Sequence, residues 1–294
     1  MAGLIAGWRE FSNCAVVALA TLSLVGTAGA AAGQLPLEPA RDSGQSVTPA
    51  YEGWFKNADG TISLLVGYFN RNHTQTLDIP VGPNNRIEPG GPDRGQPTHF
   101  LTHRQWGVFA IVVPGDFRDG KITWTLVANG KPMSVPMSLH KDYEVEPLKD
   151  AALGNTPPVV RILDPQGRPS REFQGPPRGI AALPTGFSAM VGQPLTLTVS
   201  LMDDNVTDPR RPAGATPLTV SWSQFRGPGP GGVVAFGTPK SAVGKTEGKA
   251  TTTATFSEPG EYVIRVQAND VSGDGGGGFQ CCWTNVLIKV TVGN

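Results

Sequence analysis

The sequence predicts an all-β protein built from two antiparallel β-sandwich domains that follow a signal peptide. Three observations support this prediction. Runs of Val, Ile, Leu and Phe alternate with polar residues along most of the chain, which is the period of a half-buried strand. Gly and Pro are frequent, at 38 and 27 of 294 residues, without a collagen repeat. After the N-terminal segment, no apolar stretch is long enough to span a bilayer.

The charge balance bears on the kind of partner. The formal net charge is zero and the isoelectric point is about 6.9. The chain lacks the basic excess that binds a phosphate backbone, so we expect no nucleic-acid partner.

Residues 1–32 have the pattern of a secretory signal peptide. A basic residue precedes the apolar run 14–25, which ends in the small-residue stretch GTAGAAAG. Cleavage after Ala30 and cleavage after Ala32 both remain open. An uncleaved membrane anchor is the alternative, but the second half of the segment is Gly, Ala and Thr, which insert weakly. We therefore expect a periplasmic or extracellular protein with no membrane span in the mature chain.

Residues 33–50 have no apolar period and are predicted to be a flexible lead-in. Residues 51–147 are predicted to form the N-terminal sandwich. YEGWF and TISLLVGYF flank the turn-forming run KNADG. In KITWTLVANGKPMSVPM, alternating apolar residues flank an Asn129-Gly130 turn, and WGVFAIVV is an apolar run of strand length. No family resemblance is evident in this half.

Residues 148–156 are predicted to be a linker, and residues 157–294 a second sandwich. The insert 164–186 is too rich in Pro and Gly for a helix and is predicted to be a surface loop. Apolar residues alternate in LTLTVSLM, LTVSW, EYVIRVQAND and VLIKVTV. Two half-buried sheets of this kind bury their apolar faces against each other.

The order of these segments resembles a bacterial PKD-type or related immunoglobulin-like domain over about residues 157–294. The most specific piece is FSEPGEY, which places Tyr262 as at the tyrosine corner of such sandwiches, and Trp222 matches their buried tryptophan. The tryptophan motif of PKD repeats is replaced by WSQFRGPGPGG. The resemblance implies an extracytoplasmic spacer, adhesion or ligand-presenting module rather than an enzyme.

Cys281 and Cys282 are adjacent near the start of the last strand. Strand parity predicts that their side chains diverge, and neighbouring Cα atoms about 3.8 Å apart are closer than the roughly 5.5 to 6 Å of ordinary disulfides. Three states remain open: a reduced pair, a vicinal disulfide, and a bond to another chain.

The immunoglobulin-like order implies that two loops rich in aspartate meet at one end of the second sandwich. Asp203 and Asp204 follow one strand, and Asp270 and Asp274 follow another. Gathered carboxylates suit calcium, so one interpretation is a calcium site, and no other cofactor is expected. The alternative is that they are ordinary turn residues in water.

Other chemistry is weakly indicated. His99 and His103 are four residues apart in a segment without helical period, too far apart on a strand for one ion, so we expect surface or loop roles. The sequence contains no nucleophile elbow and no phosphate-cradling loop. We therefore expect a protein that is not an enzyme.

Together these features predict an exported, non-catalytic binding or structural envelope protein that presents loops on β-sandwich domains. Its partner would be a protein or polysaccharide of the cell envelope. The alternative is a carbohydrate-binding accessory protein or module of a secreted polysaccharide-active system. In that case Tyr51, Trp54 and Trp106 would form a sugar-stacking strip.

Overall fold

A computed structural model describes residues 41–180, 183, 186–206, 218–270 and 281–294. The predicted signal segment lies outside these residues. By its contacts the chain divides into the units Met1–Pro39 and Ala40–Asn294, and every described residue belongs to the second. The regular structure described consists of strands and one 3-10 turn, Lys141–Tyr143, which confirms the predicted all-β class.

The N-terminal sandwich contains three sheets, with strand orders β1-β2-β6, β4-β7-β8 and β3-β5. Its strands are β1 (Val47–Lys56), β2 (Ile62–Asn70), β3 (Leu77–Asp78), β4 (Asn85–Glu88), β5 (His99–Phe100), β6 (His103–Val113), β7 (Ile122–Ala128) and β8 (Lys131–Met137). The first two sheets bury one apolar core that includes Leu64, Trp124 and Leu126.

Both predicted hairpins are present in this sandwich. β1 pairs with β2, and β7 pairs with β8, in antiparallel register. At the tip of the second hairpin Asn129 and Gly130 have φ values of 49° and 72°. Positive φ at both central residues is what a type I′ turn needs, and Asn-Gly adopts it most readily.

The ordered chain starts earlier than predicted. β1 begins at Val47, which is fully buried, and Gln45 and Ser46 are also buried. The backbone N–H of Gln45 donates to Oδ1 of Asn72 at 2.7 Å. Residues 45–50 therefore belong to the sandwich rather than to a flexible lead-in, and alternation missed this segment because its ordering depends on polar contacts with distant residues.

The second sandwich consists of a four-stranded sheet, β13-β15-β11-β9, and a five-stranded sheet, β10-β17-β16-β12-β14. Its strands are β9 (Val159–Leu163), β10 (Phe187–Met190), β11 (Leu195–Met202), β12 (Thr219–Arg226), β13 (Val234–Phe236), β14 (Lys240–Ala242), β15 (Glu247–Phe256), β16 (Gly260–Asn269) and β17 (Trp283–Gly293).

The apolar alternation predicted the core of this sandwich. Leu197, Val199 and Leu201 of β11 face Ile264 and Val266 of β16 in one buried cluster. The hydroxyl of Tyr262 donates to the carbonyl of Glu258 at 3.0 Å, which is the expected tyrosine-corner bond.

One pairing differs from the predicted antiparallel arrangement. β10 runs parallel to the last strand, with Phe187 opposite Val290. The chain leaves the four-stranded sheet after β9 and joins the other sheet at β10. The short run FSAM gave no signal of this change of sheet.

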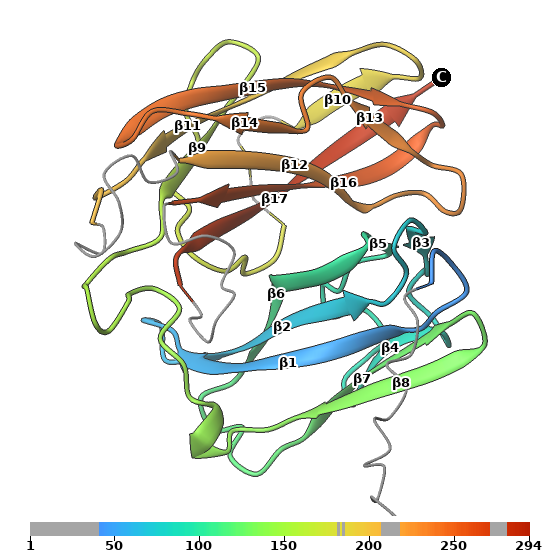
Figure 1. Cartoon of the computed structure of the whole chain (residues 1–294), viewed down its shortest axis with the longest axis vertical. Coiled ribbons are helices and arrows are strands. Elements are labelled where there is room, and N and C mark those ends of the chain that lie inside the picture. Colours follow the sequence, from blue (N-terminus) through green and yellow to red (C-terminus); the bar gives the residue numbers. More distant parts are fainter. Residues whose placement is uncertain (1–40, 181–182, 184–185, 207–217, 271–280) are drawn as a thin grey trace, which may run out of the picture. The chain divides into compact units, whose positions relative to one another are not determined.

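The two sandwiches touch through a sheet of each. The β1-β2-β6 sheet lies beside the sheet that contains β12, β16 and β17 (Figure 1). Phe225, Val263 and Leu287 belong to the second sandwich, yet they pack in the core cluster of the first. Apolar side chains therefore pack across the contact, and the predicted linker 148–156 is not the only connection.

Candidate functional site

Among the described residues, two clusters of polar groups and a pocket are candidate functional features. We call the first group the loop cluster: Asn155, Thr156, Asp203, Asp204 and Asp270. The second group, the junction cluster, lies between the sandwiches and consists of Glu52, Arg104, Gly107 and Asn285.

The loop cluster contains three of the four aspartates predicted to bind calcium. Asn155 Nδ2 donates to Asp270 Oδ2 at 2.5 Å, and the N–H and hydroxyl of Thr156 donate to Asp204 Oδ2 at 2.9 and 2.7 Å. Burial raises the pKa of Asp203 to about 6, and the charges of Asp270 and Asp204 add to this. The two aspartate loops therefore approach each other, and Asp274 lies outside the described residues.

The cysteine pair borders the loop cluster. Cys281 and Cys282 are both buried and are joined to each other by a disulfide, and the peptide bond between them is cis. Their Cα atoms are 3.1 Å apart. The expected divergence of the two side chains is not found, because that expectation assumed regular strand geometry before β17 begins. Sγ of Cys282 lies 3.4 Å from the carbonyl oxygen of Asn155.

The three aromatic residues predicted to form a sugar-stacking strip do not share an exposed surface. Trp54 belongs to the core and donates from Nε1 to the carbonyl of His140. The hydroxyl of Tyr51 donates to the carbonyl of Ser138. On another strand, the guanidinium of Arg104 covers the ring of Trp106 at 3.8 Å from the ring centroid. The prediction of an exposed strip is therefore wrong: the three side chains lie in the core or are covered by other groups. Large aromatic side chains are usually buried to a high degree in folded proteins.

The histidines take local roles. Nδ1 of His99 lies 2.8 Å from Oδ1 of Asp78, and the rings of His73 and His103 are 5.5 Å apart. Within the described residues, no three His, Cys, Asp or Glu side chains form a group that could hold a metal ion.

The junction cluster was not predicted from the sequence. Glu52 is 7% exposed and accepts from Arg104 at 2.6 Å and from the N–H of Gly107 at 2.7 Å. Burial raises the pKa of Glu52 to about 7, although Arg104 and the Gly107 N–H act to lower it. Nδ2 of Asn285 donates across the contact to the carbonyl of Gly107 at 2.7 Å. A lone Glu within YEGWF gave no sign that it would be buried.

Gly107 also allows the two sandwiches to approach closely. Its φ is 50°, and a Cβ placed there would lie 2.5 Å from the ring of Trp283. A residue with a side chain would therefore have to push the sandwiches apart or displace the indole.

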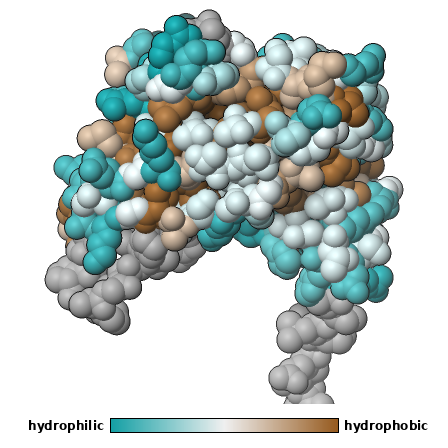
Figure 2. Space-filling model, turned by 90° about the horizontal axis from the view of Figure 1, so that it is seen from above, coloured by the Kyte–Doolittle hydropathy of each residue, from teal (hydrophilic) through white to brown (hydrophobic). Residues whose placement is uncertain are grey.

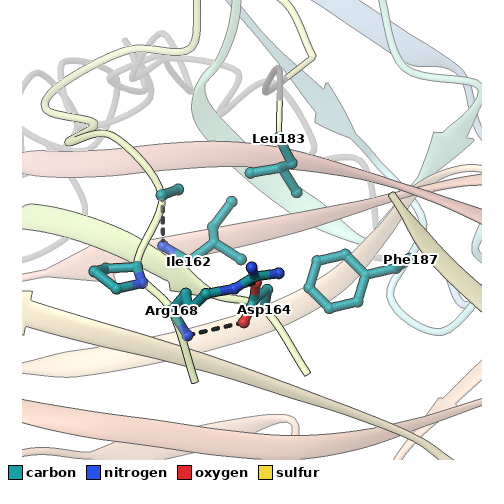
Figure 3. Close-up of a pocket in the computed structure, with 7 residues that line it drawn as sticks. Ile162, Asp164, Arg168, Leu183 and Phe187 are labelled. Carbon is teal, nitrogen blue, oxygen red and sulfur yellow. Dashed lines mark hydrogen bonds and ion pairs between the residues drawn. The ribbon is translucent and has the colours of Figure 1, made fainter. Parts of the chain in front are cut away.

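A pocket of about 440 Å³ opens on the flank of the second sandwich. It lies between β9 with the loop that follows it and β10. Its walls include Ile162, Leu183 and Phe187, with Phe187 across from the ion pair of Asp164 and Arg168 (Figure 3). Apolar walls with a few polar groups are typical of sites that bind small ligands or a single side chain.

The face of the molecule drawn in Figure 2 has no large patch of one kind. Nearly neutral residues lie at its centre, with hydrophobic and hydrophilic residues around them. On the four-stranded sheet, Thr196 and Thr198 stand opposite Thr253 and Thr251 across the β11–β15 pair. These four threonines are uncharged and polar, so this part of the sheet is neither a charged nor an apolar patch.

Comparisons with known proteins identify no family for this chain. No family model matches the chain, and no curated protein matches it. Among solved structures, the D00-D0 domain of intimin is similar at 11% identity and a TM-score of 0.26, covering 84% of this chain and all of that one. Domains 4 and 5 of the S-layer protein SbsC are similar at 15% identity and a TM-score of 0.23, covering 78% and 90%. Likenesses this weak assign no function.

The described residues include no helix that is long and apolar enough to cross a membrane.

Proposed function

We propose that this chain is an exported, non-catalytic binding or structural protein of the cell envelope, periplasmic or extracellular, that presents loops and a flank pocket on two packed sandwiches. The observation that carries the proposal is the pocket in Figure 3, where the core side chains Ile162 and Phe187 form part of the wall beside Arg168. An apolar group of a partner would find a preformed cavity there, with polar groups at its edge to set orientation.

Two further features support the proposal. Contacts of the junction cluster, together with the bidentate pair of Arg226 and Asp93 at 2.8 and 3.0 Å, fix one sandwich on the other. A rigid support lowers the entropy cost of binding a partner. The disulfide of Cys281 and Cys282 agrees with an oxidising compartment.

Export is tested with the full chain carrying a C-terminal tag in a bacterial host. We expect the protein in the periplasm or medium, shortened by the length of the signal segment. A variant with Leu22→Arg and Leu24→Arg, which interrupts the apolar run, should stay in the cytoplasm at full length. Cytoplasmic retention of the parent would contradict export, and a full-length protein in the membrane fraction would favour the anchor.

Binding is tested by co-sedimentation of the purified protein with two envelope fractions of the source cell, wall polysaccharide and membrane protein. Saturable binding to one fraction is expected, and Arg168→Glu at the pocket should weaken it. Lys249→Glu, an equally large charge change on exposed β15, is the matched control. Binding that both variants leave unchanged would remove the pocket from the proposal.

The carbohydrate-binding alternative has no comparable support. It depended on exposed aromatic residues, and Trp54 is buried while Trp106 is covered by Arg104.

A further inference from the structure

Two oxygen atoms of the loop cluster are buried without a hydrogen-bond partner. They are Oδ1 of Asn155 and Oδ1 of Asp203, both of which are shielded from solvent. Asn155 as a whole is only 2% exposed. Buried acceptors in folded proteins nearly always have a donor, and an exception calls for an explanation such as a bound ion.

The hydrogen bonds of this region show that three separate segments converge on it. Asn155 and Thr156, at the end of the predicted linker, bond to Asp270 at the end of β16 and to Asp204 after β11. The amide of Asn155 thus lies against the Asp270 carboxylate, with its second polar atom unsatisfied. Negative charge and unsatisfied oxygen are therefore concentrated in one place.

The two neighbouring aspartates, Asp203 and Asp204, differ in how many of their oxygens accept a hydrogen bond. Both oxygens of Asp204 are used: Oδ2 accepts from Thr156, and Oδ1 accepts from the N–H of Val206 at 2.9 Å. Only Oδ2 of Asp203 has a partner, the N–H of Asn205 at 2.9 Å. Asp204 consequently holds the linker in place, while Asp203 keeps an oxygen available.

We propose that Asn155, Asp203 and Asp270 bind one calcium ion. The chemistry fits, because calcium takes carboxylate, amide and backbone carbonyl oxygens in a flexible geometry. Magnesium prefers a stricter octahedron and keeps its waters, so it fits an amide and two carboxylates from three segments less well. The amide oxygen is required, since the acidic side chains described here do not form a metal-holding group of three by themselves.

Two ligand assignments differ from those predicted from the sequence. Asn155, predicted to lie in a plain linker, is a ligand, and Asp204 is not. A protein that binds nothing at the flank pocket could still bind calcium at its loops, so the calcium site does not depend on the proposed function.

The test uses the purified protein, with calcium binding measured by equilibrium dialysis and stability by thermal melting. We expect one calcium ion per chain, and a melting temperature raised by about 5 °C when calcium is one hundred times its dissociation constant. Chelator should reverse the rise, and equimolar magnesium should give a smaller one.

Matched variants assign the ligands. Asp203→Asn and Asn155→Ala should each weaken calcium binding by about tenfold or more, because charge and ligand number set the affinity of such sites. Asp204→Asn removes the same charge from the neighbouring position and should leave the affinity within about threefold, since its oxygens already have partners. If Asp203→Asn does not fold, Asn155→Ala decides the question.

Two results would overturn the proposal. One is the absence of binding and of any melting shift at millimolar calcium. The other is a parent-like affinity in Asn155→Ala, or a loss in Asp204→Asn as large as that in Asp203→Asn.

Discussion

The junction cluster and the loop cluster both contain buried polar atoms, but they differ in how their charges are compensated. At the junction, the buried carboxylate of Glu52 accepts from a guanidinium and from a backbone N–H. In the loop cluster, Asp203 and Asp204 accept hydrogen bonds from backbone N–H groups and a hydroxyl, and Oδ1 of Asn155 and Oδ1 of Asp203 accept none.

This difference separates a structural contact from a binding site. At the junction the protein itself supplies a cation and an N–H to Glu52, which offsets part of the cost of burying this carboxylate and makes the packing specific. Asp203 accepts from a backbone N–H and keeps one buried oxygen without a donor, so an additional cation would stabilise its charge.

The largest effect should come from removing the junction altogether. A fragment of residues 157–294 should still melt cooperatively, because roughly 140 residues suffice for a core. It should be less stable than the whole chain, since Phe225, Val263 and Leu287 lose their cover. Thermal melting of both proteins, followed by circular dichroism, checks this.

A second fragment sharpens the comparison. Residues 150–294 include Asn155, whereas residues 157–294 do not, so only the longer fragment should respond to calcium. A shorter fragment without any cooperative transition would count against the domain boundary that the sequence predicts.

Glu52→Ala should be the most damaging single change at the junction. It leaves Arg104 and the Gly107 N–H without their acceptor, and loss of one partner of a buried pair costs about 3 to 5 kcal/mol. Denaturant unfolding measures the free energy. Arg86→Ala, which removes an exposed ion pair with Glu88, is the control and should cost less than about 1 kcal/mol. Equal losses in the two variants would mean that the junction does not hold the sandwiches together.

The sequence predicted the two cores better than it predicted the contact between the sandwiches. Alternation identified Leu197, Val199 and Ile264 as core residues, because period-two burial is a local property of a strand. The same rule says nothing about the opposite face of a strand. β16 and β17 carry apolar residues on both faces. Val263 and Leu287 lie on the outer face of their sheet, where they pack against the other sandwich.

The candidate sites were predictable only in part. Strand order brought Asp203 and Asp270 together correctly, since topology fixes which loops are neighbours. The role of Asn155 was hidden, because a polar residue before prolines has the composition of a linker. The pocket could not be foreseen, since it depends on β10 joining the opposite sheet.

Above about pH 6, the pH dependence of stability should come mainly from the junction, because the raised pKa of Asp203 is about 6 and that of Glu52 about 7. Burial raises the pKa of Glu52 from about 4.5 to about 7, so the folded state holds this proton more tightly than the unfolded chain does. Its stabilising contribution is complete below about pH 4.5 and is lost as the pH rises through about 7. The loss is at most on the order of 3 kcal/mol.

The measurement is denaturant unfolding of the parent and of Glu52→Gln between pH 5 and pH 8, at about one-unit steps. The variant keeps the side-chain shape without the titration, so the difference between the two curves isolates Glu52. Parallel curves would show that Glu52 keeps one protonation state throughout.

The smallest effect should come from reducing the disulfide beside the loop cluster. Purified without reductant in its cleaved form, the protein should be a monomer with an intact mass two hydrogens below that of the reduced chain. Reduction should change the free energy of unfolding by about 1 kcal/mol or less, because a bond between neighbours closes the smallest possible loop. Two reactive thiols, or a dimer that reductant separates, would contradict the pairing.

Calcium affinity measured before and after reduction then relates the pair to the loop cluster. Cys282 lies against the carbonyl of Asn155, so an affinity that falls on reduction would show that the disulfide positions this ligand.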